Sequence, residues 1–214
     1  MNDVFPRHGS ASDHELLVRA ATGDRDAFAE LFDRHHTAVH RFIRQMGGTA
    51  DVADDVTQEV FVSLWRKPSH FDPGLASLTT YLYGVARNLL RRRLRFVSLR
   101  PQVDRAAVDE HRERLFSVPA DIARELDQRE QLAELRRAIL ALPFRHREVI
   151  VLCDLHELSY GEAATVVGCP VGTIRSRLNR ARCALIARCR ARLAPAGSAP
   201  RLTGRRGTMR VDAV

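Results

Sequence analysis

The stretch that decides the fold runs from Ser159 to Arg180 and reads SYGEAATVVGCPVGTIRSRLNR. A serine followed three residues later by a glutamate, as in Ser159 and Glu162, is a capping box that opens a helix. Small residues follow, and Gly168 favours the end of that helix. A second apolar repeat begins after the turn. A short helix, a tight glycine-containing turn and a longer helix in this order predict a helix-turn-helix.

The second helix of this unit leaves one polar face free of its apolar stripe. Seven arginines and no acidic residue lie between Gly172 and Leu193, so we expect these arginines to lack acidic partners. Arginine donates paired hydrogen bonds to guanine or phosphate, and Asn, Ser and Thr bond bases or backbone. The alternative is a solvated helix without a ligand. The candidates for contact with duplex DNA are Thr173, Arg175, Ser176, Arg177, Asn179, Arg180 and Arg182.

Apolar residues repeat at helical spacing through most of the remaining chain, with no strand pattern and no internal repeat. We expect helices at about 13–22, 28–46, 50–67, 78–95, 122–142 and 144–155. The sequence therefore predicts an all-α fold with two small domains, residues 12–95 and 121–193, the second containing the helix-turn-helix. Residues 96–120 lose this periodicity and predict a flexible linker, so we expect the domains to be tethered, not fused. Residues 194–214, rich in Pro, Gly and Arg, predict a disordered tail.

The balance of charge favours a polyanionic partner. Lys and Arg total 34 against 26 for Asp and Glu, a formal net charge of +8, which suits nucleic acid, although a basic surface without a ligand is the alternative. In the predicted helix 78–95, polar and aromatic residues recur at steps of three and four and form one ridge. Its arginines can hold phosphates and its tyrosine can stack on unpaired bases. The ridge candidates are Tyr81, Asn88, Arg91, Arg92 and Arg95.

Two other aromatic residues and one acidic face have two interpretations each. Tyr83 and Trp65 are candidates for base stacking, with packing in the core as the alternative. In the predicted helix 50–67, Asp51, Asp55 and Glu59 follow an i, i+4 series that would mildly repel in isolation. This repulsion is tolerable if a basic partner covers the face, and the alternative is an ordinary solvated surface.

The sequence lacks the motifs that are typical of metal sites, of common enzyme classes and of membrane or secreted proteins. The four cysteines form no CxxC pair, and no phosphate-binding loop, HExxH or GxSxG motif occurs. We therefore expect no catalytic residues, no metal, no cofactor, no small-molecule substrate and no enzymatic activity. No apolar run approaches the roughly 18 residues that span a bilayer, and the N-terminus has no secretory pattern. We expect a cytoplasmic protein without direct membrane insertion.

Four segments together resemble a known family, the extracytoplasmic-function (ECF) group of bacterial RNA polymerase sigma factors in the sigma-70 family. The segments are AFAELFDRHHTAVHRFI (27–43), ADVADDVTQEVFVSLWRK (50–67), FDPGLASLTTYLYGVARNLLRRRLR (71–95) and LPFRHREVIVLCDLHELSYGEAATVVGCPVGTIRSRLNRAR (142–182). The resemblance covers most of residues 13–95 and 122–190. Helix-turn-helix proteins in general do not share both halves in this order.

The resemblance implies an alternative sigma factor that binds core RNA polymerase and promoter DNA under the control of an anti-sigma factor in a stress response. The first domain would bind polymerase, melt DNA and recognise the −10 element, with Asn88 and the loop 71–80 capturing a flipped base. The second domain would read the −35 element. The polymerase-binding positions implied by the family are Asp54, Asp55, Gln58, Glu59 and Phe61. The alternatives are a stand-alone helix-turn-helix regulator and a sigma-like decoy for an anti-sigma factor.

Overall fold

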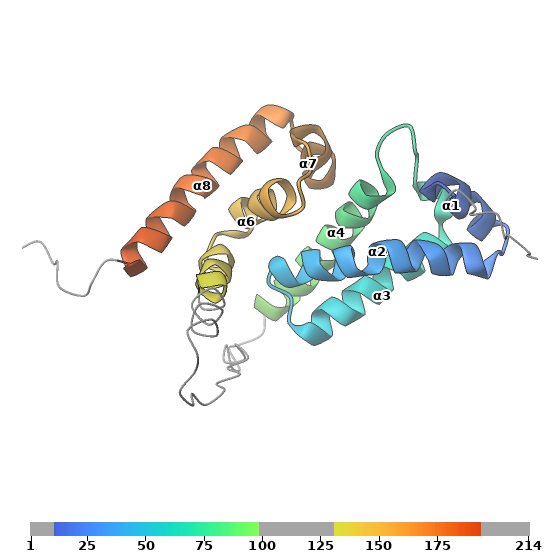
Figure 1. Ribbon diagram of the computed structural model, residues 1–214, viewed down its shortest axis with the longest axis horizontal. Coiled ribbons are helices and arrows are strands. Elements are labelled where there is room, and N and C mark those ends of the chain that lie inside the picture. Colours follow the sequence, from blue (N-terminus) through green and yellow to red (C-terminus); the bar gives the residue numbers. More distant parts are fainter. Residues whose placement is uncertain (1–10, 99–130, 194–214) are drawn as a thin grey trace, which may run out of the picture.

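The computed structural model describes residues 11–98 and 131–193, and within these ranges the regular secondary structure is helical throughout (Figure 1). This confirms the predicted all-α fold. The elements are α1 (Asp13–Ala21), α2 (Arg25–Gln45), α3 (Ala50–Arg66), η1 (Pro68–His70), α4 (Leu78–Ser98), α6 (Phe144–Ile150), η2 (Val151–Leu155), α7 (Tyr160–Val167) and α8 (Val171–Leu193). A further helical stretch covers residues 131–140. The predicted linker beyond Ser98 and the predicted tail lie outside the described residues.

The first domain is a bundle in which α2 packs against α1, α3 and α4. Local capping explains where its helices begin. Ser12 and Glu15 form a complete capping box at α1, the Asp24 side chain accepts hydrogen bonds from two backbone N–H groups of α2, and Thr49 caps α3. Each cap satisfies N–H groups that a helix start would otherwise leave without partners.

The second domain contains the predicted helix-turn-helix. Ser159 and Glu162 form the expected capping box at α7, and Gly168 ends that helix with φ of +73°, a left-handed conformation that glycine adopts without strain. The apolar side of α8 is fully buried at Ile174 and nearly so at Leu178. The opposite, polar face of α8 is therefore held toward solvent.

One predicted helix differs in its second half. Residues 144–155 form an α-helix only as far as Ile150, after which Val151–Leu155 make a π-helical turn. The backbone N–H of His156 closes this wider turn on the carbonyl of Val151 at 3.0 Å. Such turns insert one residue into a helix and are often found at functional positions.

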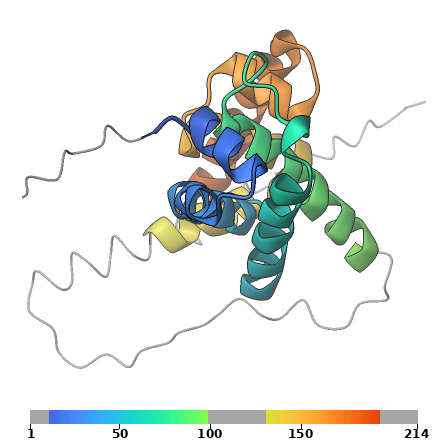
Figure 2. The same cartoon turned by 90° about the vertical axis from the view of Figure 1, so that its right-hand side faces the viewer.

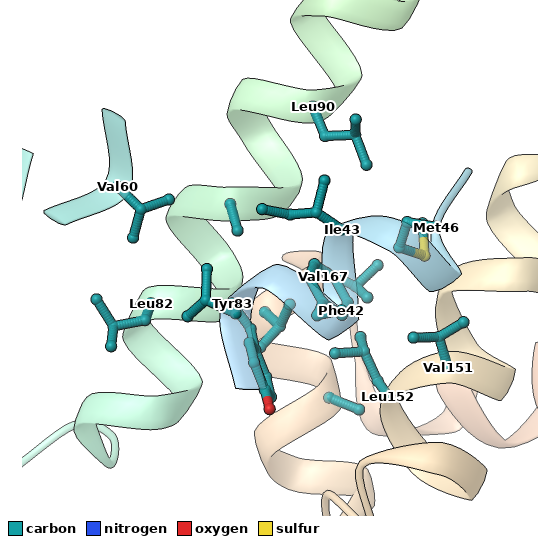
Figure 3. Close-up of a cluster of buried hydrophobic side chains, with 14 of the residues drawn as sticks. Phe42, Ile43, Met46, Val60, Leu82, Tyr83, Leu90, Val151, Leu152 and Val167 are labelled. Carbon is teal, nitrogen blue, oxygen red and sulfur yellow. The ribbon is translucent and has the colours of Figure 1, made fainter. Parts of the chain in front are cut away.

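The two domains pack directly against each other, a contact that the prediction of two tethered domains did not include. Helix α7 contacts α4, and both views of the ribbon agree on this arrangement (Figure 1 and Figure 2). Phe42 and Tyr83 of the first domain share a buried apolar cluster with Leu152 and Val167 of the second (Figure 3). The prediction came from the composition of the linker, which carries no information about whether the two domain surfaces fit.

Polar contacts across this interface are short and specific. Arg87 Nε donates to Glu148 Oε2 at 2.7 Å. His156 bridges two helices of the first domain, with its Nδ1 2.7 Å from the Tyr83 hydroxyl and its Nε2 2.7 Å from Gln45 Oε1. Because the Gln45 oxygen can only accept, Nε2 carries the proton and Nδ1 accepts from Tyr83. A neutral imidazole thus satisfies the whole chain of hydrogen bonds.

The neutral state of His156 predicts a pH dependence. Burial, and secondarily the charge of Arg41, lower the pKa of His156 from 6.5 to about 4. The unfolded chain therefore takes up a proton first, so this contribution to stability is complete above pH 6.5 and is lost as the pH falls toward 4. Because the ring is partly exposed, we expect a loss on the order of 1 kcal/mol between pH 7 and pH 5.

The measurement is the free energy of unfolding in urea at both pH values for the wild type and for His156→Gln, which cannot titrate. The variant should show the shallower pH dependence. Identical pH dependence in both proteins would contradict a buried neutral His156.

Candidate functional site

The polar face of α8 presents most of the predicted DNA-contacting residues to solvent. Arg175, Ser176, Asn179 and Arg180 are exposed. With Tyr160 at the start of α7, part of this face lines a shallow depression of about 440 Å³ where the two helices meet. Thr173 is half-buried, and its carbonyl accepts a hydrogen bond from Ser176 Oγ at 3.0 Å. The helix-turn-helix therefore carries an outward row of hydrogen-bonding side chains.

Two arginines of α8 have acidic partners, so the expectation that none would is wrong. Arg182 Nε donates to Asp154 Oδ2 at 3.1 Å, and a second bond makes the pair bidentate. Arg177 Nη1 lies 3.5 Å from Glu148 Oε1. The acids come from α6 and η2 and not from α8 itself, so a count of charges along one helix could not reveal them.

The predicted ridge of α4 is present in part. Asn88, Arg91 and Arg92 are exposed, whereas Tyr81 is half-buried and makes an edge-to-face contact with Phe71 at 5.6 Å. Burial raises the pKa of the Tyr81 phenol above its ordinary value. Arg95 belongs to α4, but its side chain lies outside the described residues.

The other two aromatic candidates lie away from this ridge. Tyr83 is buried against Phe42, with ring centroids 4.9 Å apart, so its ring is unavailable for base stacking in this arrangement. Trp65 packs edge-to-face on Phe28 at 4.8 Å, next to α2. Packing in the core thus holds for Tyr83, whereas Trp65 packs on Phe28 at the surface and is 42% exposed.

A basic cleft lies between α4 and the second domain. It has a volume of about 820 Å³ and is lined by one carboxylate, Glu148, and by the arginines Arg87, Arg91, Arg145, Arg147 and Arg177. Burial, followed by the charge of Arg145, lowers the pKa of the neighbouring His146, and burial also lowers the pKa of Arg147. Three of these arginines were missed from the sequence because only the packing of the domains brings them together. The cleft is thus lined both by Arg91 of the α4 ridge and by Arg177 of the α8 face.

The acidic face of α3 is partly neutralised within the chain. Arg93 of α4 donates to Asp55 at 2.8 Å and to Glu59 at 3.2 Å, and Arg92 donates to Glu59 at 3.2 Å. These pairs raise the pKa of Arg93. Arg92, expected to contact DNA, therefore faces an acid of α3, and no second protein is needed to relieve the repulsion there. Among the described residues, the ion pair of Asp54 is with His40, at 3.1 Å, and the Asp54 side chain is 72% exposed.

An apolar groove lies beside Asp54, between α2 and α3. Its volume is about 510 Å³ and its lining includes Phe28, Phe32, His36, His40, Asp54, Gln58, Phe61, Val62 and Trp65. Phe61 is buried, while Phe32, Val62 and Trp65 are between 37 and 42% exposed. Asp54, Gln58 and Phe61 thus share one surface with the rings of Phe28, Phe32 and Trp65, which were not predicted to bind polymerase. Clustered exposed apolar side chains of this kind mark interaction sites.

A metal-binding cluster and a membrane-spanning helix are both absent from residues 11–98 and 131–193. No cluster of three or more His, Cys, Asp or Glu side chains is arranged to hold a metal ion, and the four cysteines are free thiols. None of the described helices combines the length and apolar character needed to cross a membrane.

Comparison with known proteins gives matches over both helical units. The family model of sigma-70 region 2 matches residues 31–98, and that of sigma-70 region 4 matches residues 132–185. The ECF RNA polymerase sigma factor SigC of Mycobacterium tuberculosis is 36% identical over 182 residues, covering 83% of this chain and 94% of that protein.

Two solved structures are also similar. CnrH, in complex with the cytosolic domain of CnrY, has a TM-score of 0.63 and 29% identity, and the match covers 85% of this chain and 99% of that chain. The sigma factor RpoE, in complex with the anti-sigma factor NepR from Bartonella quintana, has a TM-score of 0.58 and 26% identity, with coverages of 76% and 96%. Both the sequence and the arrangement of helices are thus shared.

Proposed function

Since the chain belongs to the ECF group of the sigma-70 family of RNA polymerase sigma factors, we propose that its three surfaces divide the work of transcription initiation. The protein is an alternative sigma factor, and this family consists of initiation factors, not enzymes. In this proposal the α8 face reads the −35 element, the α4 ridge binds the −10 element, and core polymerase binds the surface of α3 that is formed by Asp54, Asp55, Gln58, Glu59 and Phe61. The chain itself catalyses no reaction and takes no small-molecule substrate.

The observation that carries the proposal is the outward face of α8. Its buried side fixes the helix against α6 and α7, while Arg175, Asn179 and Arg180 point away from the domain core without acidic partners in the described chain. A helix-turn-helix places such a helix in the major groove of duplex DNA. There arginine can read guanine and asparagine can read adenine, and both can also bind phosphate.

The α4 ridge suits melted DNA. Asn88 is exposed and offers an amide that can bond the edge of an unpaired base, and Arg91 can hold the adjoining phosphates. The Tyr81 ring is partly exposed and lies against Phe71 of the loop 71–80. Unstacking a base requires a few kcal/mol, which hydrogen bonding and stacking on the protein offset.

The polymerase-binding surface combines charge with an apolar groove. Asp54 and Gln58 border the groove lined by Phe32 and Trp65, with Phe61 at its floor. This combination fits a helical segment that carries basic residues beside apolar ones. We place the protein in the cytoplasm, where polymerase and promoter DNA are found. By analogy with RpoE, whose solved structure contains an anti-sigma factor, we also propose control by an anti-sigma partner.

Transcription in vitro tests this function. Purified protein and sigma-free core polymerase are combined with fragmented genomic DNA, and the 5′ ends of the RNA are sequenced. We expect new start sites that share two spaced upstream elements. If no new starts appear while another sigma factor activates the same core enzyme, the proposal fails in favour of a decoy or a stand-alone regulator.

Point variants separate polymerase binding from promoter opening. Asp54→Arg places a cation where a basic partner is proposed, so we expect affinity for core polymerase to fall about tenfold, or roughly 1.4 kcal/mol. Asn88→Ala should leave that affinity unchanged and reduce promoter opening, followed by permanganate reactivity of unpaired thymines.

Asp51→Arg is the matched control, because it makes the same change of charge one turn earlier on α3, at another exposed position. It should bind polymerase like the wild type, apart from a small general effect of charge. Equal losses in Asp51→Arg and Asp54→Arg, or loss of polymerase affinity in Asn88→Ala, would refute the assignment of these surfaces.

A further inference from the structure

The basic cleft holds more positive charge than the acids of the chain neutralise. Its lining comes from α4, α6, the turn that follows α7, and α8 (Figure 1). Five arginines and one carboxylate line the cleft, so the formal excess is four positive charges. The carboxylate, Glu148, is shared by Arg87 at 2.7 Å and Arg177 at 3.5 Å. The other three arginines of the cleft face no counter-charge.

Each of these three arginines can bind an anion. Arg91 and Arg145 are exposed, and neither has an acidic partner among the described residues. Arg147 donates from its two terminal nitrogens to backbone carbonyls, while its Nε is buried and has no hydrogen-bond partner within residues 11–98 and 131–193. A buried donor without an acceptor is unfavourable, and an anionic oxygen is a strong acceptor for a guanidinium.

A neighbouring histidine experiences the same excess of charge. Burial lowers the pKa of His146, and the charges of Arg145, Arg180 and Arg177 lower it further. No acidic side chain contributes to the shift. Several cations that converge on a concave site of lower dielectric raise the local concentration of anions.

The size and the apolar part of the cleft indicate a small ligand. Its volume of about 820 Å³ lies within the range of roughly 300–1,000 Å³ that is usual for small-molecule sites. Leu94, Phe144 and Val167 line it beside the arginines, so an organic group can pack next to the charges. Duplex DNA is instead bound by the outward face of the second helix of a helix-turn-helix.

We propose that this cleft binds a compact polyphosphate, the triphosphate of a nucleotide or inorganic triphosphate, through Arg91, Arg145 and Arg147. A nucleoside triphosphate carries about four negative charges at neutral pH, because its terminal phosphate alone carries up to two. This charge matches the formal excess of the cleft. Arginine binds phosphate oxygens through paired hydrogen bonds. Arg91 belongs to the first domain and Arg145 to the second, so one ligand contacts both.

A bound polyphosphate also affects DNA binding, a consequence that rests on the proposed function. Arg91 and Arg177 line the cleft and are candidates for contact with promoter DNA. A guanidinium that donates its hydrogen bonds to a triphosphate cannot donate the same bonds to DNA. The two ligands therefore compete for these side chains. The polyphosphate site itself is independent of this consequence, and its test uses neither DNA nor polymerase.

Isothermal titration calorimetry of the full chain tests the site at physiological ionic strength without divalent cations. The probes are ATP, inorganic triphosphate and AMP. We expect ATP to saturate a single site and AMP to bind at least about tenfold more weakly, because AMP lacks two phosphates. Inorganic triphosphate should bind as tightly as ATP if the phosphates alone are recognised, and more weakly if the apolar lining contacts the nucleoside. Absence of saturable binding by both triphosphates, or equal affinity for AMP, would refute the site.

Two variants place the ligand in the cleft. Arg91→Ala and Arg145→Ala each remove one exposed guanidinium, and each should weaken ATP binding about tenfold. Circular dichroism should show unchanged helicity, since neither side chain has an acidic partner in the described chain.

Arg136→Ala is the matched control. Arg136 is also exposed, but it lines a separate groove beside α2, so this variant should bind ATP like the wild type. Equal losses in all three variants would show a diffuse attraction to a basic protein and would overturn the proposal. A loss in only one of Arg91→Ala and Arg145→Ala would contradict a site shared by the two domains.

Discussion

The relation between the two domains depends on the buried ion pair of Arg87 and Glu148. Apolar packing alone is not directional, so the cluster around Phe42 and Leu152 would tolerate several ways of placing one domain on the other. A buried charge without its partner is strongly unfavourable. Only a relative placement of the two domains that joins the Arg87 guanidinium to the Glu148 carboxylate avoids this cost. His156 adds a second directional constraint through its two ring nitrogens. The basic cleft and the contact between Arg177 and Glu148 both follow from this placement of the domains.

Acidic partners within the chain also order several arginines of this strongly basic protein. Arg87 and Arg177 share Glu148, Arg182 is held by Asp154, and Arg93 is held by two acids of α3. Each partner orients a guanidinium and reduces the repulsion between neighbouring cations. Arg175 and Arg180 have no such partner in the described chain and remain exposed, so their charge is free to attract a polyanion.

The parts of this structure that the sequence could predict are those set by neighbours a few residues apart. Ser159 with Glu162, Gly168 and the stripe through Ile174 define the helix-turn-helix by local capping and periodicity alone. The interface at Glu148 could not be predicted, because Arg87 and Glu148 are 61 positions apart and no local pattern marks the pair. For the same reason the partners of Arg177 and Arg182 were missed. The π-helical turn at Val151 was not predicted either, since the apolar spacing of residues 144–155 is that of an ordinary α-helix.

The surface proposed to bind polymerase shows a similar division. The family resemblance indicated Asp54, Gln58 and Phe61, and the structure brings these residues to one groove. Phe28 and Phe32 were not recognised as part of that groove, since aromatic residues at helical spacing are typical of a core, and only the packing of α2 on α3 leaves their rings accessible.

A double-mutant cycle on Arg87→Ala and Glu148→Ala, read as the free energy of unfolding of the full chain, tests the central contact most directly. The structure predicts that each single change destabilises by about 3 kcal/mol or more and that the double change falls short of their sum by about 2 kcal/mol. Additivity within about 0.5 kcal/mol would show that the two side chains do not meet in solution, and the closed arrangement of the domains would then be contradicted.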